Sequence, residues 1–541
     1  MTTEAVPVES LVDDQPWWLS RGALLAWWIL AGIALGFAVG VPPVQRTQEA
    51  RVLETAREMM GRGFRGYMVP VLNGNLRVRK PPLAYWLAAG AYKIGGVSET
   101  AGRVPTVMLG WMTILVTFLG ERWLFGTRAG FFAAGTLLTS YLFFRHTRLA
   151  ETDAPAMFFV TVAVLAYWRG ALAEGLAQGF WWFQLGAAGT ALAVMSKGPP
   201  GFYPPLFLAA WCAVRREWKP LARLVMSGAP LTLIVLAAPW FIYVLKAVGI
   251  EQWKKESDEL LGGEGHGGIF LVYFPMLIQA TAPWFLVVVG AIVAAFLKIR
   301  GDWRLQGVLL WTGEVFVPLC FVGNKQNHYL TTLMPPLMIL SGWWLDWVLR
   351  SAGKDVAGRG RVPLLDATML LVVVAIPAIL VGARMIKGWI GFYDVSLAIL
   401  LAAALVFVGS VYLLRGITTA TIAFIFAALI VIVPAVGVWV PLTEPGNSRT
   451  VARELTRRFG SGPYCFYGSS FSLPLCFNLK SEIPLARRPS DLETLAAKTP
   501  GLVVISQTKS EKAPPTPPAD FVQQPPDIEV PKQTFRIYKR P

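Results

Sequence analysis

Charged and polar residues gather in the segment that follows the first apolar run, roughly residues 42–102. They form three short groups, which are Gln48-Glu49-Ala50-Arg51, Arg57-Glu58-Met59 and Lys80-Pro81-Pro82-Leu83-Ala84-Tyr85-Trp86. Ionisable residues at this density beside membrane segments indicate a functional site by default. A carboxylate there could accept a proton, and a fixed cation could stabilise a phosphate group that gains negative charge.

Shorter polar groups lie between later apolar runs and carry similar residue types. They are residues 145–153, 196–198, 249–268 and 323–328. His266, in the glycine-rich third group, could bind a metal or substrate, but a lone histidine is more often structural, and it is left outside the core site. The four cysteines show no metal-ligand spacing.

Apolar runs make up most of the chain and must position these groups. Of 541 residues, 55% are hydrophobic and 15% are charged, whereas a soluble domain carries about a quarter charged residues. Most runs approach the ~20 residues that a helix needs to cross a bilayer. We therefore predict an all-α polytopic membrane protein with about thirteen transmembrane helices. The expected spans are 22–41, 101–120, 128–144, 155–172, 180–195, 199–214, 224–246, 269–297, 305–323, 329–349, 364–384, 391–414 and 417–440.

The loops between these spans sort into two sides. Residues 121–128, 215–219, 298–304 and 350–361 are short and basic, which places them in the cytoplasm by the positive-inside rule. The N-terminus then lies inside, and the polar groups described above lie outside. The net charge of +16 suits this orientation and an anionic lipid surface or phosphate-bearing substrate, and its placement argues against nucleic acid. The first apolar run should stay as an anchor, because residues 1–20 lack the features of a signal peptide.

The character of the chain changes near residue 441. We expect a membrane domain at 1–440, with its outer loop at 42–102, and a small extracytoplasmic α/β domain with a proline-rich tail at 441–541. Its expected helices are 450–459 and 491–498, and its expected strands are 464–467, 502–506 and 533–538. In the outer loop, 48–62 has the pattern of an amphipathic helix at the membrane interface. If the outer compartment is oxidising, Cys465 and Cys476 could bridge.

The first outer loop resembles the aminoarabinose transferases and the related dolichyl-phosphate-mannose protein mannosyltransferases of the GT-C glycosyltransferase superfamily. That pattern runs Asp-Glu-x-Arg, Arg-Glu-Met, Pro-x-x-Asn-Gly, Lys-Pro-Pro-Leu-x-Tyr-Trp and Arg-x-Pro, in the order and spacing seen here. The resemblance continues at Glu151-Thr152-Asp153-Ala154-Pro155, at Ser196-Lys197-Gly198-Pro199, and at Asn324-Lys325-Gln326-Asn327-His328-Tyr329-Leu330 with Pro335-Pro336. It covers about residues 1–350.

The resemblance implies an integral membrane glycosyltransferase of the GT-C type. Such an enzyme takes a sugar from a polyprenyl-phosphate lipid at the outer face, in a bacterium at the cytoplasmic (inner) membrane, and passes it to an acceptor. Carried over by residue, the catalytic acids would be Glu49 and Asp153, and the lipid-phosphate ligands Arg51, Lys80 and Tyr329. The secondary candidates are Gln48, Tyr85, Arg103, Lys197, Lys325 and His328. The sequence does not identify the sugar or the acceptor, and the acceptor could be lipid A, another glycolipid, a cell-wall glycan or a protein.

One position departs from the family pattern. Gln48 stands where the family has an aspartate, and an amide cannot accept a proton. Either Glu49 or Asp153 then acts as the base, or the chain is a non-catalytic protein that binds or transports polyprenyl lipids. A lipopolysaccharide ligase-like transferase is a third reading, against which the Lys-Pro-Pro-Leu loop argues. No cofactor is indicated, although the chemistry leaves room for a divalent cation, and the metal requirement stays unknown.

Plain structural readings stand beside the functional ones. Lys80 and Arg51 could be interfacial cations that reach toward lipid headgroups. Glu49 could belong to the polar face of a helix and pair with an arginine. Asp153 could cap the helix that begins near Pro155, a role that is compatible with catalysis.

Overall fold

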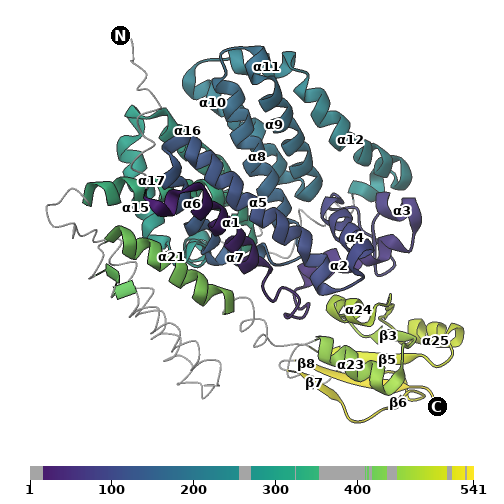
Figure 1. Cartoon of the computed structure of the whole chain (residues 1–541). Coiled ribbons are helices and arrows are strands. Elements are labelled where there is room, and N and C mark those ends of the chain that lie inside the picture. The colour runs from purple at the N-terminus through teal and green to yellow at the C-terminus, as the bar shows by residue number, and fades with distance from the viewer. Residues whose placement is uncertain are drawn as a thin grey trace, which may run out of the picture.

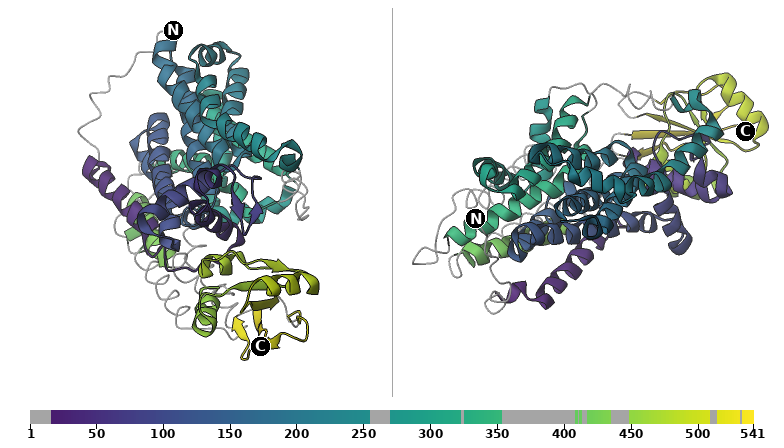
Figure 2. Two further views of the ribbon diagram at one scale, coloured as in Figure 1. Left: turned by 90° about the vertical axis from the view of Figure 1, so that its right-hand side faces the viewer. Right: turned by 90° about the horizontal axis from the view of Figure 1, so that it is seen from above.

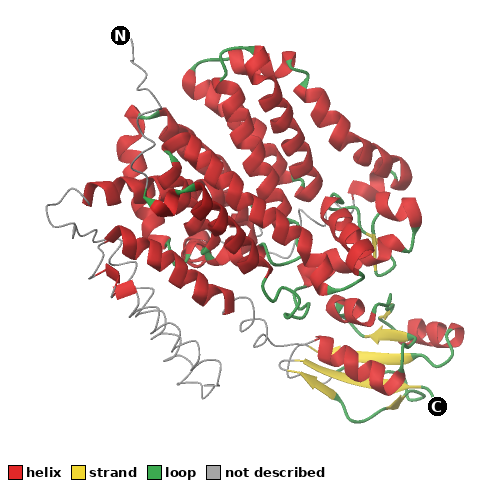
Figure 3. Ribbon diagram, in the orientation of Figure 1, coloured by secondary structure: helices red, strands yellow, loops and turns green. Residues whose placement is uncertain are grey.

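The computed structural model describes residues 16–254, 270–322, 325–352, 408–409, 411–412, 417–434, 448–508, 514–530 and 533–541. Most of them are helical (Figure 3). Figure 1 shows a large helical bundle with a small domain of strands and helices at its C-terminal end. The turned views in Figure 2 place that small domain at one end of the molecule. The general architecture predicted from the sequence is therefore confirmed.

The bundle consists of helices of 6 to 27 residues. They are α1 (Arg21–Gly36), α5 (Glu99–Phe125), α6 (Thr127–Leu138), α7 (Tyr141–His146), α8 (Asp153–Leu172), α9 (Leu176–Lys197), α10 (Tyr203–Arg215), α11 (Lys219–Met226), α12 (Ala229–Val248), α14 (Tyr273–Thr281), α15 (Phe285–Lys298), α16 (Trp303–Phe321), α17 (Met334–Ala352) and α21 (Ile417–Pro434). Two 3-10 turns, η3 (Pro199–Phe202) and η6 (Asn327–Leu333), precede α10 and α17.

Length and composition support fewer membrane spans than the sequence predicted. Among the described residues, α5, α8 and α12 are long and apolar enough to cross a membrane, and α14 with α15 makes a fourth if a pair bent by 109° counts as one span. The bend replaces the continuous span expected at 269–297. It falls at Pro283, which has no N–H for a helical hydrogen bond and disfavours helix before it. The predicted span 364–384 and most of 391–414 lie outside the described residues.

Close packing of α8 on α9 fixes the two helix ends that matter for the site. A Cβ atom on Gly186 would lie 2.3 Å from the ring of Tyr167, and one on Gly189 would lie 3.0 Å from Ala163. Small residues at these positions let the two backbones approach closely. Because α8 and α9 run antiparallel, the first residue of α8, Asp153, lies beside the last residue of α9, Lys197.

The first loop folds into a compact layer on the bundle. It contains α2 (Thr47–Met60), α3 (Gly63–Met68), the hairpin of β1 (Val71–Leu72) and β2 (Asn75–Leu76), and α4 (Leu83–Gly95). The hairpin turns at Asn73-Gly74, both with positive φ, the pairing that two-residue turns favour. The amphipathic helix predicted at 48–62 is present as α2. Its residues are mostly buried between α4 and the C-terminal domain, where the sequence predicted a helix lying on the membrane.

The C-terminal domain is a sheet with helices on both faces. Its helices are α23 (Ser448–Phe459), α24 (Leu473–Leu479) and α25 (Pro489–Lys498). Its strands are β3 (Tyr464–Tyr467), β4 (Leu485–Ala486), β5 (Val503–Thr508), β6 (Val522–Gln523), β7 (Ile528–Val530) and β8 (Gln533–Lys539). The strand order is β4-β3-β5-β8-β6, with β7 also paired to β8. The three strands at β4-β3-β5 are parallel, and β8 runs antiparallel to β5.

The bridge between Cys465 and Cys476 that the sequence permitted is not formed. Both cysteines are buried free thiols. Cys465 packs with α25 on one face of the sheet, whereas Cys476 packs with α23 on the other. Cys465 and Phe466 are neighbours in β3 and so point to opposite faces of the sheet. Cys476 of α24 packs on the face of Phe466, so the sheet lies between the two sulfur atoms.

Polar contacts fasten this domain to the first loop. Asn73 exchanges two hydrogen bonds of 2.7 Å with the backbone of Ile483, and Arg62 forms an ion pair with Glu482 at 2.6 Å. Leu473 and Phe477 of α24 add apolar contacts to the core that α2 and α4 form. The domain therefore rests on the layer that carries the first-loop candidates.

Candidate functional site

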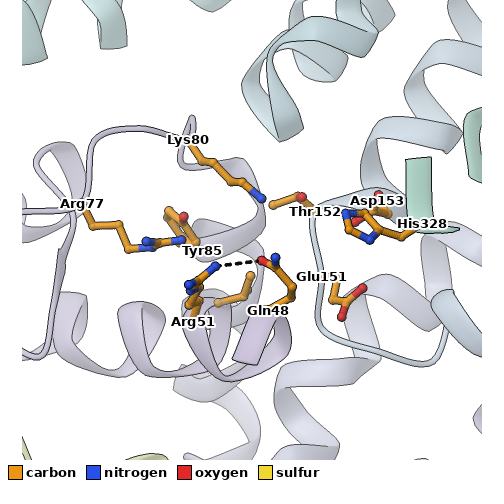
Figure 4. Close-up of a pocket in the computed structure, with 10 residues that line it drawn as sticks. Gln48, Arg51, Arg77, Lys80, Tyr85, Glu151, Thr152, Asp153 and His328 are labelled. Atoms are coloured by element: carbon orange, nitrogen blue, oxygen red, sulfur yellow. Dashed lines mark hydrogen bonds between the residues drawn. The ribbon is translucent and has the colours of Figure 1, made fainter. Parts of the chain in front are cut away.

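A small cavity lies where the first loop meets the start of α8 (Figure 4). Its volume is about 10 Å³, about the space that one water needs. Residues of α2, α4, the loops before α4 and α8, the start of α8 and η6 line it. They are Gln48, Arg51, Val52, Arg77, Lys80, Tyr85, Glu151, Thr152, Asp153 and His328.

Three cations from the first loop face this cavity. Figure 4 shows Arg51, Arg77 and Lys80 on the same side of it. Lys80 makes no hydrogen bond or ion pair with the described part of the chain, and burial, assisted by the charge of Lys197, lowers its pKa to about 8. Burying a cation without a partner is unfavourable. An anion in the cavity would stabilise its charged form.

Two carboxylates from the second loop face the cations. Asp153 forms an ion pair with Lys197 at 2.5 Å. Glu151 lies 2.8 Å from Arg46 and 3.1 Å from His146. Burial opposes the ionisation of Glu151, but the hydrogen bond and charge of His146, with the charge of Arg46, outweigh it and lower its pKa. Glu151 is therefore ionised at neutral pH.

His328 and Tyr329 approach from η6. Burial lowers the pKa of His328 to about 4, although Asp153 opposes the shift, so His328 is neutral at physiological pH. The ammonium of Lys197 lies 4.8 Å from the ring centroid of Tyr329. Tyr329 thus contacts the partner of Asp153 and does not line the cavity. Lys325 points elsewhere and donates to the carbonyl of Val322 at 2.8 Å.

Glu49 does not line the cavity, although the family pattern puts it in the acidic pair. Its two oxygen atoms accept from Arg103 at 2.7 and 2.9 Å, and both side chains are only 1% exposed. Glu49 also accepts from the backbone N–H of Ala150 at 3.1 Å, and Arg103 donates to the carbonyls of Val39 and Pro42. This pair ties α2, α5 and the loop before α8 together.

The rotation of α2 explains which of its residues reach the cavity. Gln48, Arg51 and Val52 have helical spacing i, i+3, i+4 and therefore share one face of the helix. Glu49 lies about 100° away from Gln48 around the helix axis, on the side of Arg103. The structure thus brings together six of the sequence candidates, which are Gln48, Arg51, Lys80, Tyr85, Asp153 and His328.

Two charged lining residues were not among the candidates. Arg77 ends the hairpin and begins the basic run before Pro81, and Glu151 stands two residues before Asp153. Both lie in or beside motifs that the sequence singled out, so their positions carried a usable signal. Within the described ranges, no group of three or more His, Cys, Asp or Glu side chains could hold a metal ion.

Comparison with known proteins supports the resemblance that the motifs indicated. Residues 79–243 match a family described as dolichyl-phosphate-mannose-protein mannosyltransferase. The chain is 24% identical over 338 residues to an undecaprenyl phosphate-alpha-4-amino-4-deoxy-L-arabinose arabinosyl transferase of Proteus mirabilis, covering 61% of this chain and 60% of that one. A transferase with the same description from Pseudomonas aeruginosa is 26% identical over 351 residues, covering 62% of each chain.

The matched region spans about three fifths of the length of these curated relatives. Similarity of fold extends further. The crystal structure of ArnT from Cupriavidus metallidurans bound to undecaprenyl phosphate superimposes with a TM-score of 0.74 at 16% identity, covering 96% of this chain and 98% of ArnT. The chain is thus similar in sequence to aminoarabinose transferases and, over residues 79–243, to protein mannosyltransferases, and it has the fold of ArnT.

Proposed function

We propose that the chain is an integral membrane glycosyltransferase that moves a sugar from a polyprenyl-phosphate-linked donor to an extracytoplasmic acceptor. One observation carries this proposal: three first-loop cations and two second-loop carboxylates meet in one cavity. The cations suit the donor phosphate, and a carboxylate suits the proton of the acceptor. The undecaprenyl phosphate bound to ArnT, a protein of the same fold, supports a polyprenyl donor.

In the proposed reaction, the acceptor oxygen attacks the anomeric carbon in a single inverting displacement. The bond from that carbon to the phosphate oxygen breaks, and polyprenyl phosphate leaves with the electron pair. Lys80, with Arg51 and Arg77, stabilises the departing phosphate. Asp153 accepts the acceptor's proton once Lys197 shifts away from it. Glu49 acts through Arg103 as a positioning residue that holds α2 in place.

The proposed placement follows the charge pattern of the loops. About thirteen spans, as the charge and hydropathy pattern indicates, would put the N-terminus in the cytoplasm and the cavity outside, at the bacterial inner membrane. The membrane domain would occupy residues 1–440, and the domain at 441–541 would lie outside above the first loop. The acceptor is then a lipid, a glycan or a protein presented at the outer surface, and the cavity must widen to admit donor and acceptor.

A turnover assay tests the proposed function. The purified full-length protein in lipid vesicles would be mixed with an undecaprenyl-phosphate-linked aminoarabinose and lipid A. Release of undecaprenyl phosphate together with sugar-bearing lipid A, seen by mass spectrometry, is the expected result. If this acceptor fails, lipid extracts and glycans from a deletion strain should lack one glycan product. An unchanged envelope in the deletion strain, together with an inactive purified protein, would refute the proposed transferase activity.

A second candidate is a polyprenyl-lipid-binding protein without catalysis. The observation that favours it is Gln48, which faces the cavity where the family has a carboxylate. Such a protein would bind undecaprenyl phosphate through Lys80 but release no sugar. Binding of undecaprenyl phosphate without turnover in the vesicle assay, together with an unchanged envelope in the deletion strain, would select this candidate.

A reporter experiment tests the proposed topology. Alkaline phosphatase fused after Pro541 should be active, because that enzyme needs an extracytoplasmic environment. The same reporter at Lys354 should be inactive, since a basic cytoplasmic loop is expected there. Activity in the reverse pattern would contradict both the span count and the side of the cavity.

Binding of undecaprenyl phosphate is expected to weaken as pH rises through about 8. Lysine is charged below its pKa, and the pKa of Lys80 in the unliganded protein is about 8, so its charged fraction falls from about 90% at pH 7 to about 10% at pH 9. Affinity would be measured by native mass spectrometry or tryptophan fluorescence. Lys80→Arg, which keeps its charge, should flatten this dependence. An identical pH profile in the variant would show that Lys80 does not bind the phosphate.

A further inference from the structure

A second cavity lies toward the end of the bundle opposite the candidate site, and its volume is about 430 Å³. It is bounded by α5, α8 and α9. At this end of the bundle, α8 and α9 contact α11 (Figure 1). Asp153 lines the candidate site and Arg169 lines the second cavity. They are sixteen positions apart on α8, roughly 24 Å along the helix axis. The second cavity is therefore separate from the candidate site.

The lining is apolar except for a small cationic and aromatic cluster. Arg122, Trp123, Arg169 and Trp182 form this cluster. The guanidinium of Arg169 lies 4.6 Å from the ring centroid of Trp123 and 4.9 Å from that of Trp182. The two rings fix the position of the cation without neutralising it. Neither arginine forms an ion pair with an acidic side chain that the structure describes.

The charges around the mouth are mainly positive. Glu121, the neighbour of Arg122, is fully buried on a different side of α5. Arg223 of α11 donates to the carbonyl oxygens of Ala171 and Ala173 at the end of α8, outside the cavity lining. Glu174 is the acidic residue of the loop that follows α8, and it is exposed. An anion at the two lining arginines would be electrostatically favourable.

The apolar part of the lining restricts the kind of anion. Leu119 and Leu185 are 47% and 44% exposed at the cavity, so the mouth presents hydrocarbon to its surroundings. A small soluble anion would leave this surface uncovered. An uncharged polyprenyl chain would cover it but would not use the arginines. The occupant that satisfies both is an amphiphile with an acidic headgroup.

We propose that this cavity binds an anionic phospholipid of the cytoplasmic leaflet. Arg122 and Arg169 hold the headgroup phosphate, and an acyl chain lies along Leu119, Leu165 and Leu185. The leaflet follows from the direction of α8, because its Arg169 end contacts α11, which directly follows the basic loop at 215–219 that the charge pattern places in the cytoplasm. Basic pockets between membrane helices on that side suit acidic headgroups. The proposal does not depend on the transferase activity.

Native mass spectrometry of the purified full-length protein tests this proposal with three added lipids, which are phosphatidylglycerol, phosphatidylcholine and undecaprenyl phosphate. The unaltered protein should retain phosphatidylglycerol in preference to phosphatidylcholine. The double variant Arg122→Gln/Arg169→Gln should bind phosphatidylglycerol roughly tenfold or more weakly. Its binding of undecaprenyl phosphate should not change, since that lipid is expected at the other end of α8.

The matched control is Arg215→Gln, which removes an exposed arginine stacked on Trp211 at 5.7 Å outside the cavity. It should bind phosphatidylglycerol normally. Leu185→Trp, which fills the mouth and keeps both arginines, should weaken binding even if the double variant folds poorly. Equal retention of phosphatidylglycerol and phosphatidylcholine, or a loss confined to undecaprenyl phosphate in the double variant, would overturn the proposal.

Discussion

Lys80→Ala and Asp153→Asn are each expected to reduce sugar transfer by about 10²–10³-fold while the protein stays folded in detergent. Lys80 faces the cavity without a partner among the described residues. Its removal therefore deletes a positive charge that stabilises the departing phosphate, and it breaks no ion pair within the described part of the protein. Asp153→Asn keeps the size of the side chain and removes its capacity to accept a proton. Turnover of the polyprenyl-phosphate sugar by purified variants measures both effects.

Two controls separate chemistry from general damage to the loops. Arg65→Ala removes an exposed first-loop cation that does not line the cavity, and its turnover should be near normal. Gln48→Ala should cause a milder loss than Asp153→Asn, because an amide can only position or hydrogen-bond. Normal turnover in both Lys80→Ala and Asp153→Asn would contradict the proposed catalytic site and favour the lipid-binding candidate.

Arg103→Gln should destabilise the protein by about 3–5 kcal/mol, because it leaves Glu49 buried without its ionic partner. Glu49→Gln leaves Arg103 in the same position and should be similarly unstable. The double variant Glu49→Gln/Arg103→Gln should recover part of the loss, since neither residue then carries an unpaired charge. Melting temperatures in one detergent compare the variants, and Arg457→Gln, which breaks an exposed ion pair with Glu454, should change little.

The same variants distinguish positioning from catalysis at Glu49. If Glu49 positions α2 through Arg103, loss of turnover in Glu49→Gln should accompany the loss in melting temperature, and the double variant should restore some of both. A Glu49→Gln protein that melts normally yet transfers no sugar would instead identify Glu49 as a catalytic carboxylate.

The sequence singled out candidate residues by their type and order. The structure brings Lys80 and Asp153, which come from two separate motifs, to one cavity although the chain leaves the first loop and returns before reaching Asp153. The motifs could not separate Gln48 from Glu49, because neighbours on a helix point in different directions and the rotation of α2 is set by Arg103 on α5. That contact joins residues far apart in the chain, and no local pattern encodes it.

The elements of the C-terminal domain were also largely readable. The strand at 464–467 was predicted with the bounds of β3, and the helices at 450–459 and 491–498 differ from α23 and α25 by two residues or fewer at their ends. Helix α24 was missed because Pro474, which suits the first turn of a helix, follows a run typical of a loop. Hydropathy predicted the bundle but not the bend at Pro283, since both halves of that segment are apolar.

The fastening of the small domain to the first loop limits how relatives of this chain can exchange parts. Leu473 and Phe477 complete the core of α2 and α4, and Asn73 is matched to the backbone at Ile483. A chimaera that receives a foreign C-terminal domain alone would therefore combine two surfaces that never adapted to each other. The first loop and the C-terminal domain should therefore be exchanged together, although more than three hundred residues separate them in the sequence.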